Sequence, residues 1–299
     1  MANLGPEGTS ARRHAVELRA LGRTVAAQGR LGAEAVESTA RLVEDMVGYA
    51  RTDGAQRVGL VATEAVRQAA DGASLQDRVR ALTGQRLHVL TGEAEARLSY
   101  LGATAFRVAS GQAALVADVG GASTEVVPGQ GSQPAPGVSL KLGSDRLLLI
   151  TKADDPPTAR QRADALARVS MVLEKAPAPA GTGPLIATGG TAANVPALLG
   201  QRRRICESDA GLREEPPGPG WTRIERTQLE LAVGLTGRHP SAEVARRSGL
   251  SPARARLMAG GVLILLGLLD RYQVASVEVT ERGLRDGVLL ALAGFKPQA

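Results

Sequence analysis

The hydrophobic and polar positions along the chain follow two periods, one typical of helices and one of strands. Apolar residues recur at helical spacing in several segments, which are 31–50, 65 onward, 75–82, 91–105, 159–175, 227–236, 241–248, 252–270 and 284–292. Short apolar runs predict buried strands at 57–63, 86–90, 113–118, 124–128, 138–142, 184–187 and 274–280. Strands that alternate with helices are typical of the α/β class.

Most of the remaining segments predict loops, and one predicts a weak strand. Residues 1–12 predict a loose tail, 15–21 alternates weakly enough to be a strand, and the polar, proline-containing 201–220 predicts a surface loop. The longest uncharged apolar run, Leu257–Leu269, has 13 residues. A membrane-spanning helix needs about 20 apolar residues. We therefore expect a buried helix here and no membrane partner.

Length and composition narrow the classes of protein further. At about 150 residues per domain, a chain of 299 residues predicts two domains. Aromatic residues make up 2% of the chain, too few for the stacking platforms that hold single-stranded nucleic acid, so we expect no specific nucleic-acid partner. One cysteine, Cys206, excludes an intramolecular disulfide and a cysteine-ligated zinc site, which fits a reducing, cytoplasmic setting.

The charge balance is basic, with a formal net charge of +6 and 32 arginines among the 36 basic residues. The planar guanidinium of arginine suits two-point contacts to phosphate. A genome whose codons favour arginine explains the same composition. Binding to a polyanion is compatible with either explanation.

Two glycine-rich turns follow apolar strands, at Gly120–Gly121–Ala122–Ser123 and at Gly189–Gly190–Thr191. Glycine lets backbone N–H groups approach an anion closely, so such turns can hold phosphate. Neither turn continues into the Gly-Lys-Ser/Thr of a P-loop. Plain hairpin geometry is the alternative for each turn.

Four charged residues near these turns are candidates for chemistry. Asp118 ends a strand that is otherwise uncharged, where it could bind Mg²⁺ or cap the turn, and Glu125 lies within the next apolar strand, where it could face the same site or solvent. Glu95 lies in the first turns of a helix, where an acid also complements the helix dipole. Arg67 follows a strand and could contact phosphate or form a surface ion pair.

Six segments, taken in order, resemble the motifs of the exopolyphosphatase / guanosine pentaphosphate phosphohydrolase (Ppx/GppA) family. They are VATEAVRQA at 61–69, LTGEAEARL at 90–98, DVGGASTE at 118–125, SLKLGSDRL at 139–147, ATGGT at 187–191 and ERGLRDG at 281–287. The resemblance implies an α/β, two-lobed, actin/Hsp70/sugar-kinase-like (ribonuclease H-like) fold with a phosphate-binding cleft between the lobes. We place the lobes at 1–112 and 113–299, with the last helix packing back on the first lobe.

The resemblance also implies an activity and its residues. Such enzymes release the terminal phosphate from inorganic polyphosphate or from pppGpp, using Mg²⁺ and water. Glu95 matches the catalytic base, and Asp118 and Glu125 match the acids of the metal site. The residues that would bind phosphate are Arg67, Gly120, Gly121, Ala122, Ser123, Gly189, Gly190 and Thr191.

The chain departs from the family pattern at several places. The family opens with a strand and D-x-G-T-N-S, and no such strand precedes residue 13, which predicts an N-terminally truncated first lobe unless the true start lies upstream. The alternative function is therefore a non-catalytic protein that binds polyphosphate or (p)ppGpp. Glu64 stands where Ser or Thr is usual, and brings negative charge toward the expected phosphate site. The apolar helices after Ser241 predict a homodimer.

Overall fold

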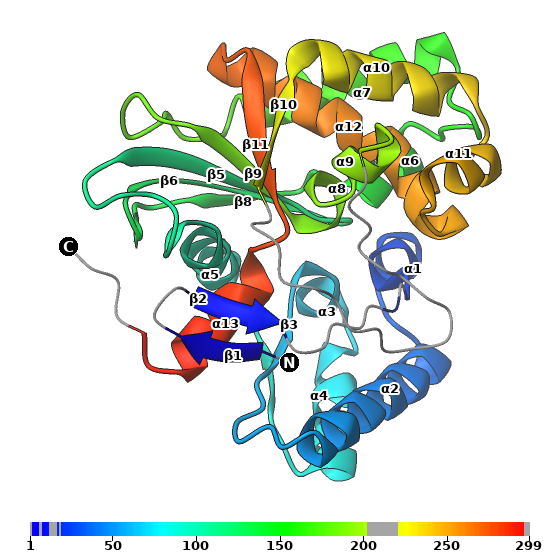
Figure 1. The fold of residues 1–299 in the computed structure, drawn as a ribbon. Helices are drawn as coiled ribbons and strands as arrows, with labels where there is room; N and C mark the ends of the chain where they lie inside the picture. The colour runs from blue at the N-terminus through cyan, green and yellow to red at the C-terminus, as the bar shows by residue number, and fades with distance from the viewer. Residues whose placement is uncertain (1, 6–7, 12–16, 18, 202–220, 296–299) are drawn as a thin grey trace.

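A computed structural model describes residues 2–5, 8–11, 17, 19–201 and 221–295 (Figure 1). The helices are α1 (Leu21–Gln28), α2 (Ala33–Thr52), α3 (Glu64–Gln68), α4 (Gly72–Thr83), α5 (Gly92–Thr104), α6 (Ser144–Ile150), α7 (Ala159–Leu173), α8 (Gly189–Ala192), α9 (Val195–Leu198), α10 (Arg226–Arg238), α11 (Ser241–Ser248), α12 (Pro252–Tyr272) and α13 (Leu284–Leu292). The strands are β1 (Ala2–Gly5), β2 (Gly8–Ala11), β3 (Leu60–Ala62), β4 (Leu87–Val89), β5 (Ala113–Val119), β6 (Thr124–Gln130), β7 (Gln133–Pro134), β8 (Val138–Leu140), β9 (Leu185–Thr188), β10 (Trp221–Glu225) and β11 (Ser276–Thr280).

In the described part of the chain, seven strands form one mixed sheet in the order β10-β11-β9-β5-β6-β7, with β8 also paired to β6. The central strands β5, β9 and β11 run parallel, and β6 returns antiparallel to β5. In the register of β5 and β9, Asp118 lies beside Thr188. The two glycine-rich turns therefore follow the carboxyl ends of neighbouring strands, on the same side of the sheet.

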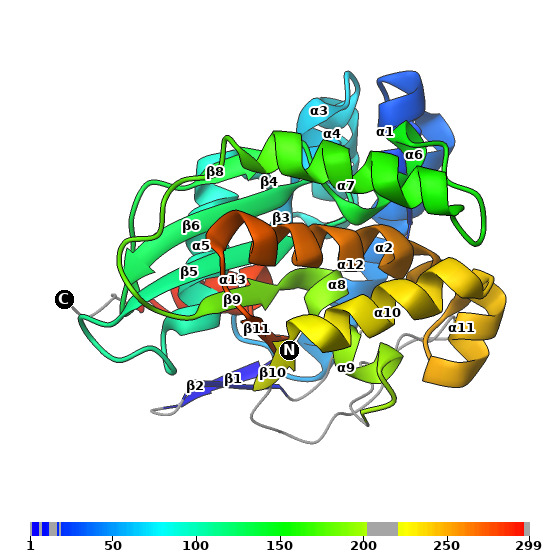
Figure 2. The same cartoon turned by 90° about the horizontal axis from the view of Figure 1, so that it is seen from above.

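Both faces of this sheet are covered. Along β5, Leu115, Ala117 and Val119 join the core under α7, α10 and α12, whereas Ala114 and Val116 join a second core with α5. This alternation is the period of two that a pleated strand imposes. Figures 1 and 2 show α7, α12 and α10 across one face, and Figure 1 shows α5 and α13 beneath the other.

The helix α12 contains the apolar run at 257–269. By length and composition alone it is apolar enough to cross a membrane, and 67% of its most apolar window is buried inside the fold. Met258, Val262 and Leu265 on this helix have no measurable exposure because they pack in the core of the large sheet. The helix is the buried core helix expected from the sequence.

The helices α5 and α13 approach each other closely through glycines. A Cβ added at Gly102 would lie 1.9 Å from the carbonyl oxygen of Gly283, and one at Gly287 would lie 2.0 Å from that of Leu98. Any side chain at these positions would force the helices apart. The last helix therefore packs on α5, which itself covers the large sheet; the lobe boundary at 112/113 stays a prediction.

The N-terminal part has its own small core. The strands β3 and β4 pair in parallel, and α1, α2, α3 and α4 pack around them through residues such as Leu31, Leu75 and Val79. The carboxylate of Asp71 fixes the entry to α2 by accepting hydrogen bonds from the amides of Leu31 and Gly32, at 2.7 and 2.8 Å.

Several sequence predictions were wrong at the ends and edges. The tail predicted at 1–12 contains the antiparallel pair of β1 and β2. The strand predicted at 15–21 is absent from the described residues of that range, and α1 begins at Leu21. The edge strand β10 and the short helix α6 were not predicted. The loop predicted at 201–220 lies outside the described residues except for Gln201.

Candidate functional site

The start of α5 places an acid against the large sheet. Thr91 caps the helix, its hydroxyl accepting a hydrogen bond from the amide of Ala94 at 3.1 Å. Glu95 lies one turn into the helix and is 5% exposed. Ser99 follows four residues later, which puts both side chains on the same face of the helix.

Two more acids meet this face of α5 from the sheet. Ser99 donates a hydrogen bond of 2.5 Å to the carboxylate of Asp118 at the end of β5. Asp118 and Glu125 are direct partners in the antiparallel pairing of β5 and β6, so their side chains point to the same face. Ser139 on β8 donates to Glu125 at 2.6 Å. The structure therefore brings together the three acids that the sequence nominated.

Burial dominates the electrostatics of this cluster. Burial raises the pKa of Glu95 to about 7, with Asp118 adding to the rise and Arg67 opposing it. Burial raises the pKa of Glu125 to about 8, and the charges of Glu95 and Asp118 raise it further. The pKa of Asp118 is also raised by burial, while Ser99 pulls it back. These acids share a site in which their charged forms repel each other.

A hard divalent cation would relieve this repulsion, and the donor set consists of oxygens only, as Mg²⁺ requires. Within the described ranges, no group of three or more His, Cys, Asp or Glu side chains is arranged to hold a metal. Mg²⁺ commonly uses one or two carboxylates and completes its shell with water and substrate phosphates. Asp118 and Glu125 therefore fit a Mg²⁺ site that is shared with a phosphate ligand.

Arg67 lies at this site, with its guanidinium held on three sides. It donates to Glu95 at 3.0 Å, to Glu64 at 2.5 Å and to the carbonyl oxygen of Leu90 at 2.5 Å. Glu64 also accepts a hydrogen bond from Gln68. The negative charge that Glu64 brings is thus paired within α3, and Arg67 fixes the position of the Glu95 carboxylate.

The first glycine-rich turn is closed from within and supported by α6. The amide of Gly120 donates to the carbonyl oxygen of Ser123 at 3.0 Å. The amides of Ser144 and Asp145 donate to the carbonyl oxygens of Gly120 and Gly121, at 2.9 and 3.0 Å. The short helix α6 therefore fixes the outer side of the turn, and the amide of Gly120 is used inside it.

The second turn lies against the acid cluster. Gly189 has a φ of +88°, and a Cβ there would lie 2.4 Å from an oxygen of Asp118. The side chain of Thr191 faces α12, because a Cβ at Gly261 would lie 2.3 Å from its hydroxyl oxygen. The Thr191 hydroxyl is therefore packed against α12.

Two arginines at the site carried no signal that sequence reasoning used. A Cβ at Gly190 would lie 2.5 Å from the guanidinium of Arg254, which is 9% exposed in the first turn of α12. The charge of Arg285 lowers the pKa of Asp118. Arg285 lies in the segment 281–287, which resembles a family motif. Nothing in the sequence separated Arg254 from the other arginines.

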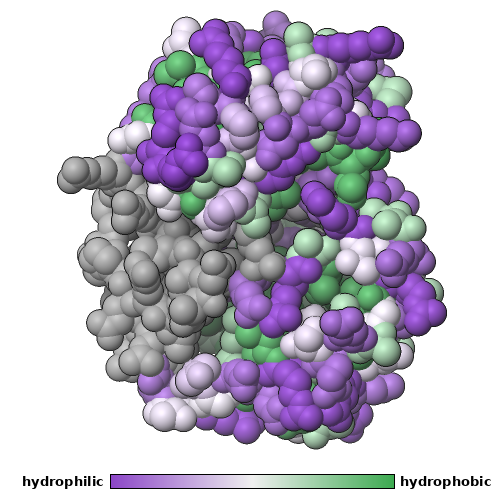
Figure 3. Space-filling model, turned by 90° about the vertical axis from the view of Figure 1, so that its right-hand side faces the viewer, coloured by the Kyte–Doolittle hydropathy of each residue, from purple (hydrophilic) through white to green (hydrophobic). Residues whose placement is uncertain are grey.

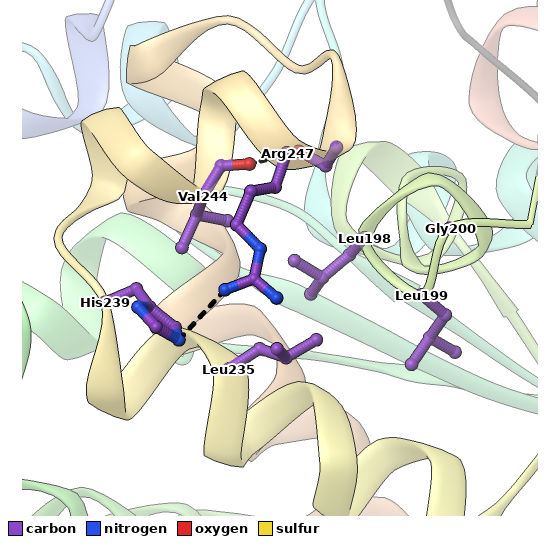
Figure 4. A pocket seen from close by; sticks show the side chains of 8 residues that line it. Leu198, Leu199, Gly200, Leu235, His239, Val244 and Arg247 are labelled. Atoms are coloured by element: carbon purple, nitrogen blue, oxygen red, sulfur yellow. Dashed lines mark hydrogen bonds between the residues drawn. The ribbon is translucent and has the colours of Figure 1, made fainter.

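A hollow in the surface lies between the N-terminal part, with its small core, and the part built on the large sheet, on the side of α1 and α11 (Figure 3). A separate cavity of about 200 Å³ lies away from the acid cluster, between α9, α10 and α11 (Figure 4). Its lining is mostly apolar, with His239 and Arg247 in contact at 3.0 Å. None of the residues nominated from the sequence lines it.

Comparison with known proteins gives one consistent result. The model of the Ppx/GppA phosphatase family matches residues 11–294. Exopolyphosphatase 2 of Mycobacterium tuberculosis is 30% identical over 289 residues, covering 92% of this chain and 86% of that protein. Exopolyphosphatase 1 of the same species is 29% identical over 263 residues, covering 87% of this chain and 73% of that protein.

Solved structures agree with the fold. A structure of the PPX-GPPA enzyme of Aquifex aeolicus has a TM-score of 0.73 and 26% identity, covering 92% of this chain and 88% of that one. An exopolyphosphatase-like protein with 24% identity has a TM-score of 0.83, covering 97% of this chain and 92% of that one. These likenesses confirm the two-lobed, actin-like α/β class expected from the sequence.

Proposed function

Because the chain belongs to the Ppx/GppA phosphatase family, we propose that it hydrolyses the terminal phosphoanhydride bond of inorganic polyphosphate, with pppGpp as the second candidate substrate. Its mycobacterial relatives are named exopolyphosphatases, which supports the choice of polyphosphate. The observation that carries the proposal is that Glu95, Asp118 and the turn at Gly189 meet at the carboxyl ends of the central strands β5 and β9.

In this proposal Glu95 is the general base. Its carboxylate orients a water molecule and accepts its proton, while the water oxygen bonds to the terminal phosphorus. The P–O bond to the next phosphate breaks. The products are orthophosphate and a polyphosphate chain that is one unit shorter. A base works best when its pKa is near the operating pH, and burial raises the pKa of Glu95 to about 7. Arg67 keeps the carboxylate in place.

The remaining residues bind and neutralise phosphate. Asp118 and Glu125 would hold Mg²⁺, directly or through water, and the cation would neutralise charge on the phosphate oxygens. The amides of Gly121, Ala122 and Ser123 would bind the terminal phosphate. The residues that would bind the adjoining phosphate are the backbone of Gly189, Gly190 and Thr191 and the guanidinium of Arg254. Catalysis of this kind depends mainly on positioning and electrostatics.

The test is phosphate release from long-chain polyphosphate with and without Mg²⁺. We expect Glu95→Gln to lower kcat by about 10²–10⁴-fold, the usual contribution of a general base. Glu93→Gln is the matched control, because Glu93 is exposed in the same helix turn. Equal rates for Glu95→Gln and the parent protein would overturn the role of Glu95.

A second measurement tests the metal separately from turnover. Mg²⁺ is expected to raise the Tm of the parent protein because it neutralises Asp118 and Glu125, and to raise it less in Asp118→Asn. An equal Mg²⁺ effect in both proteins would remove Asp118 from the metal site.

Binding without hydrolysis is the second candidate function. One observation favours it: the Glu95 carboxylate already accepts a hydrogen bond from Arg67 at Oε2, which leaves one of its two oxygens for a water. Polyphosphate binding by the parent protein with no phosphate release in Mg²⁺ would establish this candidate instead.

A further inference from the structure

The helix α1 joins the N-terminal part to the first glycine-rich turn. It packs against α3 on one side and α6 on the other. A Cβ at Gly22 would lie 3.3 Å from the Cβ of Ala122, so the helix backbone passes directly beside the turn. A side chain at position 23 consequently leaves α1 next to the place where the terminal phosphate is proposed to bind.

That side chain is Arg23, which reaches across to α6. Its Nη2 and Nε donate to a single oxygen of Asp145, at 2.6 and 3.2 Å. The amide of Asp145 in turn donates to the carbonyl oxygen of Gly121 at 3.0 Å. Asp145, which holds the guanidinium, is therefore itself hydrogen-bonded to the turn. The Arg23 side chain is 48% exposed, although that of its partner Asp145 is only 10% exposed.

Arg146, the neighbour of Asp145, provides a contrast within the same helix. Its Nε donates to the carbonyl oxygen of Ala122 at 2.8 Å, and its Nη2 donates to Gln68 at 3.0 Å. The guanidinium of Arg146 thus supports the backbone of the turn. Asp145 takes two of the five N–H donors of Arg23, whose side chain is half exposed beside the turn.

We propose that Arg23 is a substrate-binding residue, whose guanidinium contacts phosphate oxygens beside the Gly120–Ser123 turn while Asp145 holds it in place. This inference rests on the proposed function, since it needs a phosphate in that turn. It also gives the Arg23–Asp145 pair a purpose. An unpaired carboxylate at 145 would repel the substrate, and its pairing places a cation at the same rim.

The experiment measures binding of inorganic polyphosphate to the Glu95→Gln protein, whose turnover is expected to be about 10²–10⁴-fold slower, at several salt concentrations. Adding Arg23→Gln is expected to weaken binding about tenfold, the loss typical of one charge-assisted hydrogen-bonded contact. The slope of log affinity against log salt should fall by about one, because one fewer phosphate charge is neutralised. Arg23→Lys keeps the charge and should keep the slope.

The matched control is Arg41→Gln on α2. Arg41 is 56% exposed and ion-paired with Glu37 and Glu44, so it resembles Arg23 in exposure and pairing but lies in another part of the fold. Affinity and salt slope should not change in this variant. In the catalytically active protein, Arg23→Gln should raise KM about tenfold and leave kcat within about twofold, because only binding is affected.

The outcomes separate the two proposals. Arg23→Gln that matches Arg41→Gln in affinity and salt slope overturns the role of Arg23 and leaves the proposed function standing. A Glu95→Gln protein that binds no polyphosphate at all overturns the proposed function, and the role of Arg23 with it. An equal fall in the Tm of Arg23→Gln and Arg23→Lys, with affinity lost in both, identifies a structural role and also overturns the inference.

Discussion

The two glycine-rich turns have the same Gly-Gly pair and leave neighbouring strands, but only the second has the left-handed backbone conformation that favours glycine. Gly189 has a φ of +88°, a conformation that other residues adopt at a cost, and a Cβ there would also lie 2.7 Å from the carbonyl oxygen of Val119. Gly120 and Gly121 do not have positive φ. A Cβ at Gly121 would meet only the Cβ of Asp145, at 4.0 Å.

This difference shows that one sequence pattern can have two physical causes. At Gly189 the backbone conformation and the contact with Asp118 require glycine, whether or not a ligand binds. At Gly121 the fold leaves room for a methyl group, so packing does not require glycine there. Under the proposed function, the glycine at 121 would keep the approach to the first turn open, whereas the glycine at 189 is required by the fold itself.

The largest expected effect comes from Gly189→Ala. The strained backbone and the overlap with Asp118 and Val119 should lower the free energy of unfolding by roughly 2–4 kcal/mol. Displacement of Asp118 should also lower kcat/KM by about 10²-fold, since small misplacements of reacting groups are costly. Denaturant unfolding and phosphate release measure the two effects.

Gly121→Ala is the comparison for that variant. Its free energy of unfolding should stay within about 0.5 kcal/mol of the parent, as for an unstrained surface substitution. Its KM for polyphosphate should nevertheless rise, because the methyl group lies where the phosphate approaches. Equal destabilisation by both alanines would show that the two turns do not differ as the geometry indicates.

The sequence predicted the parts of this arrangement that depend on local pattern. The strands β5 and β9, which end at Val119 and Thr188, are largely apolar runs, and the bounds predicted for α11 and α13 agree with the structure. The edge strand β10 was missed because a five-residue strand owes its existence to pairing with β11, far away in the sequence. Long-range pairing of this kind leaves no periodic signal in so short a segment.

The same distinction applies to the site. Glu95, Asp118 and Glu125 were nominated because acids in apolar surroundings stand out and match family motifs. Their mutual proximity could not be derived without the register of β5 and β6 and the hydrogen bond from Ser99. The contact between Arg254 and Gly190 joins α12 to the second turn, and only the fold places them together.

The next prediction concerns how kcat/KM depends on pH. The titrating acid Asp118 lies between the two turns, and residues 188–191 of the second turn contain no titratable side chain of their own. Because burial raises the pKa of Glu95 to about 7 and the base must be deprotonated, kcat/KM should fall about tenfold per pH unit below that value. Thr191→Val should leave this limb unmoved. A flat profile between pH 5 and 8 would contradict the assignment of Glu95.

Stability should show the opposite trend with pH in the absence of Mg²⁺. Glu95 and Glu125 have folded-state pKa values raised by burial to about 7 and about 8, so between the ordinary carboxyl pKa and those values the folded protein binds more protons than the unfolded chain. The free energy of unfolding should therefore decrease as pH rises from about 4.5 to 8. Glu125→Gln should flatten the upper part of this curve. A stability that rises through this range would show that the cluster is not buried as described.

The smallest effect concerns Ser99, which supports the acid that lies between the two turns. Ser99→Ala removes the 2.5 Å hydrogen bond to Asp118 in a fully buried setting, which should cost about 1–2 kcal/mol of unfolding free energy. Loss of this donor should raise the pKa of Asp118 further, since the Ser99 hydroxyl stabilises the charged carboxylate. More Mg²⁺ should then be needed for half-maximal activity, by a few-fold, with kcat at saturating Mg²⁺ nearly unchanged. Ser38→Ala on α2, whose hydroxyl makes only a 3.4 Å contact with a backbone carbonyl, is the control and should change neither quantity. If Ser99→Ala leaves the Mg²⁺ requirement unchanged and lowers only stability, then Ser99 packs the helix α5 against β5 and does not tune the metal site.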